Sequence, residues 1–306
     1  MSKRNMRGRI SEVANWRLRM LLVLLGLALV VAGERLDAQD EVVDGIVIYN
    51  KLCAACHGKS GGGRGRAARY VFPHPRDLRH DQFRLVSTLS RKPSRDDIRG
   101  VLEEGVPGTS MQSWKTLGAE KLDALVSRVL QLREEGAVER IDREIQQAGT
   151  VDSKQAMQVR TEYVRRVMTA GPQWKGVPDT TVDAALIGRG EKIYRQQKCN
   201  SCHGERGRGS VGMDLVDQRG DPTWATDLIS DPLHGGSDRV SIARRIYLGM
   251  PGSAMPSSEN LAEADLQALV AYCMSLAVPP ARSTTNHQRR GRAIGYFPVK
   301  NNRKSP

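Results

Sequence analysis

The sequence predicts an all-α protein of two tandem domains joined by a partly helical linker. The first reason is an internal repeat, since four short blocks of the first half recur in the same order in the second half, 144 to 146 residues further on. The second reason is the recurrence of apolar residues at three- and four-residue steps, the spacing of an amphipathic helix. The third is the length of 306 residues, which is typical of about two domains.

The repeated blocks define two copies of one domain, because shared composition alone would not preserve both their order and their spacing. They are Gly45 to Tyr49 and Gly190 to Tyr194, Cys53 to Gly58 and Cys199 to Gly204, Gly105 to Met111 and Gly249 to Met255, and Leu122 to Val126 and Leu266 to Val270. We therefore place the first domain at 41–135 and the second at 181–279.

Each copy is predicted to end in an amphipathic helix. The apolar positions are Leu122, Leu125, Val126 and Val129 in the first copy and Leu266, Leu269, Val270, Cys273 and Met274 in the second. Cys273, the odd one of five cysteines, aligns with Val129. We interpret it as a small buried apolar residue, in preference to a reactive thiol or a ligand.

The segments outside the two copies differ from them in composition. The linker, 136–180, is charged, with helices predicted near 138–147 and 154–168, then a Gly/Pro-rich loop at 171–178, and we expect it to pack lightly. The tail, 280–306, has seven basic residues and no acidic one, which is typical of a disordered or partner-bound extension.

Residues 1–33 predict export from the cytoplasm. Six basic side chains and one acidic side chain precede or flank an apolar run of about 14 residues that ends in small residues, the pattern of a secretory signal peptide. A spanning helix needs about 20 apolar residues, so an uncleaved anchor is the alternative. We expect a periplasmic protein. The alternative is a protein that is associated with the membrane through this segment.

Two Cys-x-x-Cys-His sequences, Cys53 to His57 and Cys199 to His203, carry the chemistry. This is the attachment sequence of haem c, in which two thiols bind the porphyrin and the adjacent histidine binds the iron. The expected cofactors are two covalently bound haem c groups, held by Cys53, Cys56, Cys199 and Cys202, with His57 and His203 as iron ligands. A four-thiolate zinc site is the alternative, but zinc ribbons place their cysteine pairs about 15 to 20 residues apart, far closer than these.

Met111 and Met255 are the expected sixth ligands. Each follows a Gly-x-Pro-Gly turn in its copy, and a thioether raises the potential of the iron and closes it to other molecules. The histidine alternatives are His74 or His80 for the first haem and His234 for the second, which do not align with one another.

Two features around the attachment sites remain open. The carbonyl of Pro73 or Pro75 could accept a hydrogen bond from the second ring nitrogen of His57, whereas no such partner is evident for His203. Four arginines follow the histidines closely and either pair with haem propionates or form solvated loops: Arg64, Arg66, Arg206 and Arg208.

With these motifs the chain resembles the class I cytochromes c, and within them the secreted bacterial di-haem cytochromes c. The resemblance covers 41–135 and 181–279 and includes Cys-x-x-Cys-His, a methionine near a Pro-Gly turn and a closing helix in both copies. The segments Pro75 to Leu78 and Gly108 to Trp114 also look like the first domain of such proteins. The resemblance implies a helical fold, one-electron transfer, and the axial pairs His57/Met111 and His203/Met255.

We expect a di-haem electron carrier of a respiratory chain, or the cytochrome subunit of a larger oxidoreductase, and not an enzyme in its own right. A redox partner could be a molybdenum oxidoreductase or a haem-copper oxidase. The alternative is a di-haem cytochrome c peroxidase, but matched methionines argue for two closed irons. The net charge of +13, or +8 without 1–33, suggests nucleic-acid binding as a third function. Export from the cytoplasm argues against it.

Overall fold

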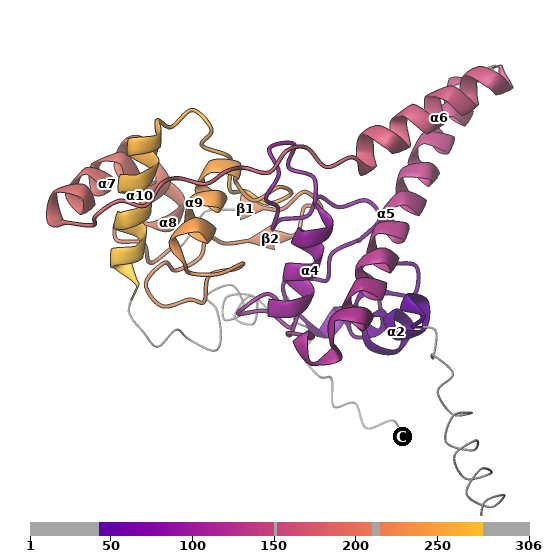
Figure 1. The fold of residues 1–306 in the computed structure, drawn as a ribbon, viewed down its shortest axis with the longest axis horizontal. Coiled ribbons are helices and arrows are strands. Elements are labelled where there is room, and N and C mark those ends of the chain that lie inside the picture. Colours follow the sequence, from indigo (N-terminus) through magenta and orange to yellow (C-terminus); the bar gives the residue numbers. More distant parts are fainter. Residues whose placement is uncertain (1–42, 150–151, 210–214, 278–306) are drawn as a thin grey trace, which may run out of the picture. The chain divides into compact units, whose positions relative to one another are not determined.

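The computed structural model describes residues 43–149, 152–209 and 215–277, and these form a mainly helical protein (Figure 1). The only sheet among them is an antiparallel pair, β1 (Leu215–Val216) and β2 (Pro222–Thr223). The predicted all-α class is therefore confirmed. The predicted signal segment and basic tail lie outside the described residues. No helix among the described ranges is long and apolar enough to cross a membrane.

The first domain contains α2 (Gly45–Leu52), α3 (Ala54–His57), α4 (Arg95–Glu104), α5 (Ala119–Ala148) and the short 3₁₀ turns η1 (Ala68–Tyr70) and η2 (Lys115–Leu117). Local sequence starts the helices. The Asp44 side chain accepts hydrogen bonds from the first backbone amides of α2, and Ser94 and Asp97 form a reciprocal capping box at α4.

The core of this domain forms where α2 crosses α5. Tyr49 of α2 is buried with the predicted apolar face of α5, Leu122, Leu125, Val126 and Val129. Gly45 allows the crossing, because a Cβ atom there would lie 2.2 Å from the carbonyl oxygen of Ala124. The small residue that begins the repeat is thus explained by close backbone contact.

The second domain has the same sequence of helices, α7 (Ala184–Gln196), α8 (Cys199–His203), α9 (Arg239–Leu248) and α10 (Glu263–Leu276). Figure 1 shows α7, α8, α9 and α10 gathered together. Leu266, Leu269 and Val270 of α10 are buried as predicted, and Gly190 of α7 lies against α10. Met274 is 38% exposed, so its assignment to the apolar face is wrong.

The linker packs more closely than the sequence predicts. The expected separate helix near 138–147 is the continuation of α5, which crosses the predicted boundary between 135 and 136 without a break. The second linker helix, α6 (Ser153–Met168), folds back along α5 (Figure 1). Residues 171–174 then pair with 87–90 of the first domain, and Trp174 stacks on Tyr247 of the second at 5.3 Å between ring centroids.

Polar contacts join the two domains directly. Arg84 donates to the buried carboxylate of Asp217 at 2.9 Å, and Gln218 donates to Asp81 at 2.6 Å. Arg219 donates to the backbone carbonyl of Pro75 at 3.0 Å. Residues 217–219, which follow strand β1, therefore lie against the loop that follows the first Cys-x-x-Cys-His sequence.

Candidate haem sites

The first attachment sequence lines a cavity of about 450 Å³ in the first domain. Cys53, Cys56, His57 and Met111 all line it, although 54 residues separate this histidine from the methionine. Most of the other lining residues are apolar, among them Leu78, Ile98 and Val129. An apolar cavity with two thiols and an imidazole at one side has the donor set that covalent haem attachment requires.

The orientation of His57 suits iron binding. Its Nδ1–H donates to the backbone carbonyl of Arg76 at 3.0 Å, which leaves Nε2 as the unprotonated nitrogen. Burial lowers the pKa of the imidazole, so the neutral ring that a metal requires is favoured. The predicted acceptor, the carbonyl of Pro73 or Pro75, is wrong. The carbonyl that accepts is that of the neighbouring Arg76, while both prolines line the cavity.

Tyr49 is hydrogen-bonded to the end of the attachment helix. Its hydroxyl donates to the carbonyl of Gly58 at 2.8 Å, just after His57, and burial raises the pKa of the phenol. Burial also raises the pKa of Cys53 to about 11. Both groups therefore remain protonated at neutral pH.

A tight turn presents Met111. The amide of Thr109 donates to the carbonyl of Val106 at 3.1 Å, with Pro107 second and Gly108, at a φ of +75°, third in the turn. This is the type II pattern, in which glycine favours the positive φ. The amide of Val106 donates to the carbonyl of Met111 at 2.8 Å. This hydrogen bond closes the loop and fixes the position of the Met111 backbone.

The three alternative histidines occupy different places. His74 lines the first cavity, with Nδ1–H donating to the carbonyl of Ala68 at 3.2 Å. His80 is bound to Asp77 outside that cavity wall. His234, the alternative for the second haem, lines the first cavity.

The arginines of the first cavity also differ from those expected. Arg76 and Arg84 line it, whereas Arg64 and Arg66 are not among its lining residues. Burial lowers the pKa of the Arg84 guanidinium to about 10, and its closest carboxylate is that of Asp217 in the second domain. The sequence carried no signal for this pair, because neither residue lies in a repeated block.

The second attachment sequence has equivalent local geometry. His203, at the end of α8, donates from Nδ1 to the carbonyl of Thr226 at 3.0 Å, which supplies the partner that sequence reasoning missed. Burial lowers the pKa of this imidazole as well. The hydroxyl of Tyr194 donates to the carbonyl of Gly204 at 2.8 Å, as Tyr49 does to Gly58 in the first domain.

Met255 lies in a loop built like that of Met111. The amide of Ser253 donates to the carbonyl of Met250 at 3.0 Å, Gly252 has a φ of +71°, and the amide of Met250 donates to the carbonyl of Met255 at 3.1 Å. Met255 packs against the core of the second domain together with Cys199. The equivalent backbone contacts therefore recur at both methionines.

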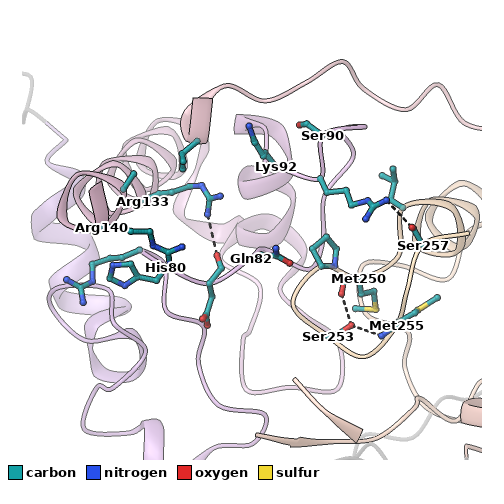
Figure 2. A pocket seen from close by; sticks show the side chains of 18 of the residues that line it. His80, Gln82, Ser90, Lys92, Arg133, Arg140, Met250, Ser253, Met255 and Ser257 are labelled. Atoms are coloured by element: carbon teal, nitrogen blue, oxygen red, sulfur yellow. Dashed lines mark hydrogen bonds between the residues drawn. The ribbon is translucent and has the colours of Figure 1, made fainter. Parts of the chain in front are cut away.

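The loop that contains Met255 borders a second, more polar cavity of about 560 Å³, and Met255 itself lines this cavity. Figure 2 shows Met255 and Ser253 on one side of it and Arg133, Arg140 and His80 across from them. Arg133 donates to the carbonyl of Asp81 at 3.3 Å, and burial lowers the pKa of its guanidinium. The surroundings of this loop are therefore mainly basic.

Cys273 lies outside both attachment sequences, although it packs against the same core as Cys199. It packs against the core of the second domain, and burial raises its pKa to about 12. None of the five cysteines forms a disulfide bond, and no group of three His, Cys, Asp or Glu side chains within 43–149, 152–209 and 215–277 could hold a metal ion.

An attachment helix, an apolar cavity and a methionine loop together define a c-type cytochrome domain. Two family models agree with this class, one described as cytochrome c, which matches 187–277, and one described as cytochrome C oxidase, cbb3-type, subunit III, which matches 40–127. The chain therefore contains two cytochrome c domains, which implies covalently bound haem c and electron transfer.

One solved structure is similar to this chain over most of the length of both chains. It is a chain of the reducing HAO-like protein complex of Kuenenia stuttgartiensis, with 25% identity and a TM-score of 0.59, and the match covers 76% of this chain and 96% of that one. Comparison with curated proteins gives no match.

Proposed function

We propose that the chain is an exported di-haem cytochrome that passes single electrons in a respiratory chain, as the cytochrome subunit of a larger oxidoreductase or as its carrier. The observation that carries the proposal is the meeting of Cys53, Cys56, His57 and Met111 at one apolar cavity. When bound, haem supplies an iron that alternates between the ferrous and ferric states.

The residues of the chain would adapt that iron to fast electron transfer. His57 and Met111 come from separate segments of the first domain and would both bind the iron, which would leave no position open for a substrate. The apolar lining excludes water, so little solvent reorganises when the charge of the iron changes. His203 and Met255 are proposed to have these roles in the second domain.

Partnership with a larger redox protein has two lines of support. The similar solved chain belongs to a complex of HAO-like proteins. The loop of Met255 also borders the basic cavity that contains Arg133 and Arg140, which favours an acidic partner surface near the second haem. A molybdenum oxidoreductase or a haem-copper oxidase remains our proposed partner class. Residues 1–33 support a periplasmic location, with the uncleaved anchor as the alternative.

Haem counting after export in a host with cytochrome c maturation tests the proposal. The pyridine haemochrome spectrum should give two haems per chain, and Cys56→Ala or Cys202→Ala should each remove one. Cys273→Ala is the matched control, because this cysteine lies outside both attachment sequences and should leave the count unchanged. A count that does not fall in the first two variants would contradict the attachment sites.

Electron transfer itself is tested with the purified holoprotein. Ferric spectra should show methionine ligation at both irons, and association with an acidic redox partner should slow as salt rises. Rapid peroxide turnover would instead favour the cytochrome c peroxidase alternative. Purification from native membranes with partners attached would identify the oxidoreductase, and the mass of the mature chain would show whether 1–33 is removed.

A further inference from the structure

The cavity of the first domain has a wall that belongs to the second. His234 and Met250 line it together with Cys53, His57 and Met111, although more than a hundred residues of chain separate them from these groups. Neither residue has a role in the second attachment site by sequence alignment, since Met250 aligns with Val106 and His234 lies outside the repeated blocks.

Hydrogen bonds and close packing fix the loop that contains His234. Arg245 of α9 donates to the carbonyls of Gly235 at 3.0 Å and Gly236 at 2.6 Å. A Cβ atom on Gly235 would lie 2.9 Å from the side chain of Leu85, which itself lines the first cavity. The positive φ of +77° at Gly235 and this close contact both require glycine, so the loop is fitted to the first domain.

The imidazole of His234 lies in a cationic environment. Burial, together with the nearby guanidinium groups of Arg84 and Arg245, lowers its pKa to about 4, so the ring is neutral and keeps one N–H donor. Three carboxylates face these charges: Asp217 is bound to Arg84, Asp81 also lies near Arg84, and Asp238 lies near Arg245. Arg84 also lines the cavity, so a haem carboxylate at this end would meet a cation and a neutral donor together.

Met250 reaches the first cavity from the loop that presents Met255. Its backbone amide binds the carbonyl of Met255, and Met250 lines both the first cavity and the polar cavity beside Met255. In the first domain the aligned residue, Val106, also lines this cavity. The longer side chain of Met250 therefore adds an apolar surface that the first domain does not supply for itself.

We propose that the second domain completes the haem pocket of the first, with His234 donating a hydrogen bond to a haem carboxylate beside Arg84 and Met250 closing the apolar side. This inference rests on the proposed haem occupancy of the first cavity. It assigns to two residues of the second domain the control of the potential of the first haem and of the access of small molecules to it.

The first test replaces His234 in the full-length holoprotein. His234→Leu keeps the bulk but removes the N–H donor, so the carboxylate charge is less compensated and the ferric state is favoured. We expect a lower potential for the first haem, an unchanged potential for the second, and restoration of the wild-type value in His234→Gln, which keeps a donor. The potential that changes in Met111→Ala identifies the first haem.

Equal potentials in the wild type and both His234 variants would overturn the role of His234, as would a change at the second haem alone. A wild-type protein without haem at Cys53 and Cys56 would instead overturn the proposed function. Circular dichroism and the visible spectrum check that each variant is folded and loaded.

The second test measures carbon monoxide binding after flash photolysis in ferrous Met111→Ala protein, because the proposed Met111 ligand closes the first iron to other molecules in the wild type. Adding Met250→Ala should admit the ligand to the first haem about tenfold faster, because truncating a packed side chain opens a gap that its neighbours fill only partly. Met274→Ala in the same Met111→Ala protein is the matched control, since this methionine of the same domain lies on α10 and is 38% exposed. Equal rates with and without Met250→Ala would overturn the role of Met250.

Discussion

The crossing of α7 and α10 allows a sharp test of how the second domain is packed. Gly190 of α7 has no room for a side chain, because a Cβ atom there would lie 2.0 Å from the carbonyl oxygen of Ala268 and 2.7 Å from the Cβ of Tyr272. In Gly190→Ala the helices must separate by about 1 Å, since interiors are close-packed and cannot absorb the overlap. Such overpacking costs about 1–3 kcal/mol, against about 1 kcal/mol of improved helix propensity.

We therefore expect Gly190→Ala to lower the free energy of unfolding by up to about 2 kcal/mol. For a domain of 60–100 residues, each kcal/mol corresponds to about 4–8 °C in the melting temperature. The assay is thermal unfolding of the loaded protein, followed by far-ultraviolet circular dichroism and by the haem absorbance of the second domain.

Gly188→Ala is the matched control, because this glycine lies in the same helix and nothing lies within 4 Å of its added Cβ. It gains the same helix propensity without the overlap, so its stability should rise by about 0.4–1 kcal/mol. Equal effects of the two substitutions, or stabilisation by both, would refute the close approach of α7 and α10.

Three further predictions concern single side chains. Met111→Ala should lower the potential of the first haem by about 100 mV, or about fiftyfold in the redox equilibrium at 59 mV per tenfold, and a redox titration that finds no change would exclude this methionine as a ligand. Tyr194→Phe removes the hydrogen bond to the carbonyl of Gly204 and should cost about 1–2 kcal/mol in chemical denaturation, whereas an unchanged midpoint would mean that the bond contributes nothing. Burial raises the pKa of Cys273 to about 12, so its thiol stays protonated below that pH. Iodoacetamide should therefore label Cys273 far more slowly in the native than in the unfolded protein. Equal labelling of the two states, measured by mass spectrometry, would contradict its burial.

The closing helices could be predicted from sequence because burial follows their periodicity directly. Leu122, Leu125 and Val126 recur at helical spacing and all three are buried. The same rule extends one residue too far at Met274, near the end of α10, where an apolar side chain can remain exposed at little cost.

The continuity of α5 could not be predicted, because its cause is a tertiary contact. Gly136 lies inside the helix, at the predicted boundary, and a glycine there weakens a helical prediction. In the structure a Cβ atom at this position would lie 2.5 Å from the side chain of Arg79 and 2.6 Å from its carbonyl oxygen. The glycine therefore permits close packing of the loop on the helix and does not end it.

The carbonyl partners of the two histidines show a similar limit. Motif spacing identifies His57 and His203, but the acceptors Arg76 and Thr226 contribute only backbone oxygen atoms. A backbone acceptor places no demand on the type of side chain, so no residue type marks it. Only the path of the loop, which depends on the fold as a whole, brings these carbonyls to the imidazoles.

The repeat explains what the two domains share, and the segments outside it explain how they differ. The attachment sequences, the methionine turns and the closing helices all lie in matched blocks and have equivalent contacts in both domains. The contacts between domains instead come from unmatched residues, such as Arg84 with Asp217, or from an unmatched choice within a block, as at Met250 against Val106. Because Met250 and His234 of the second domain line the first cavity, the two proposed haem environments differ, and we expect the two haems to differ in potential.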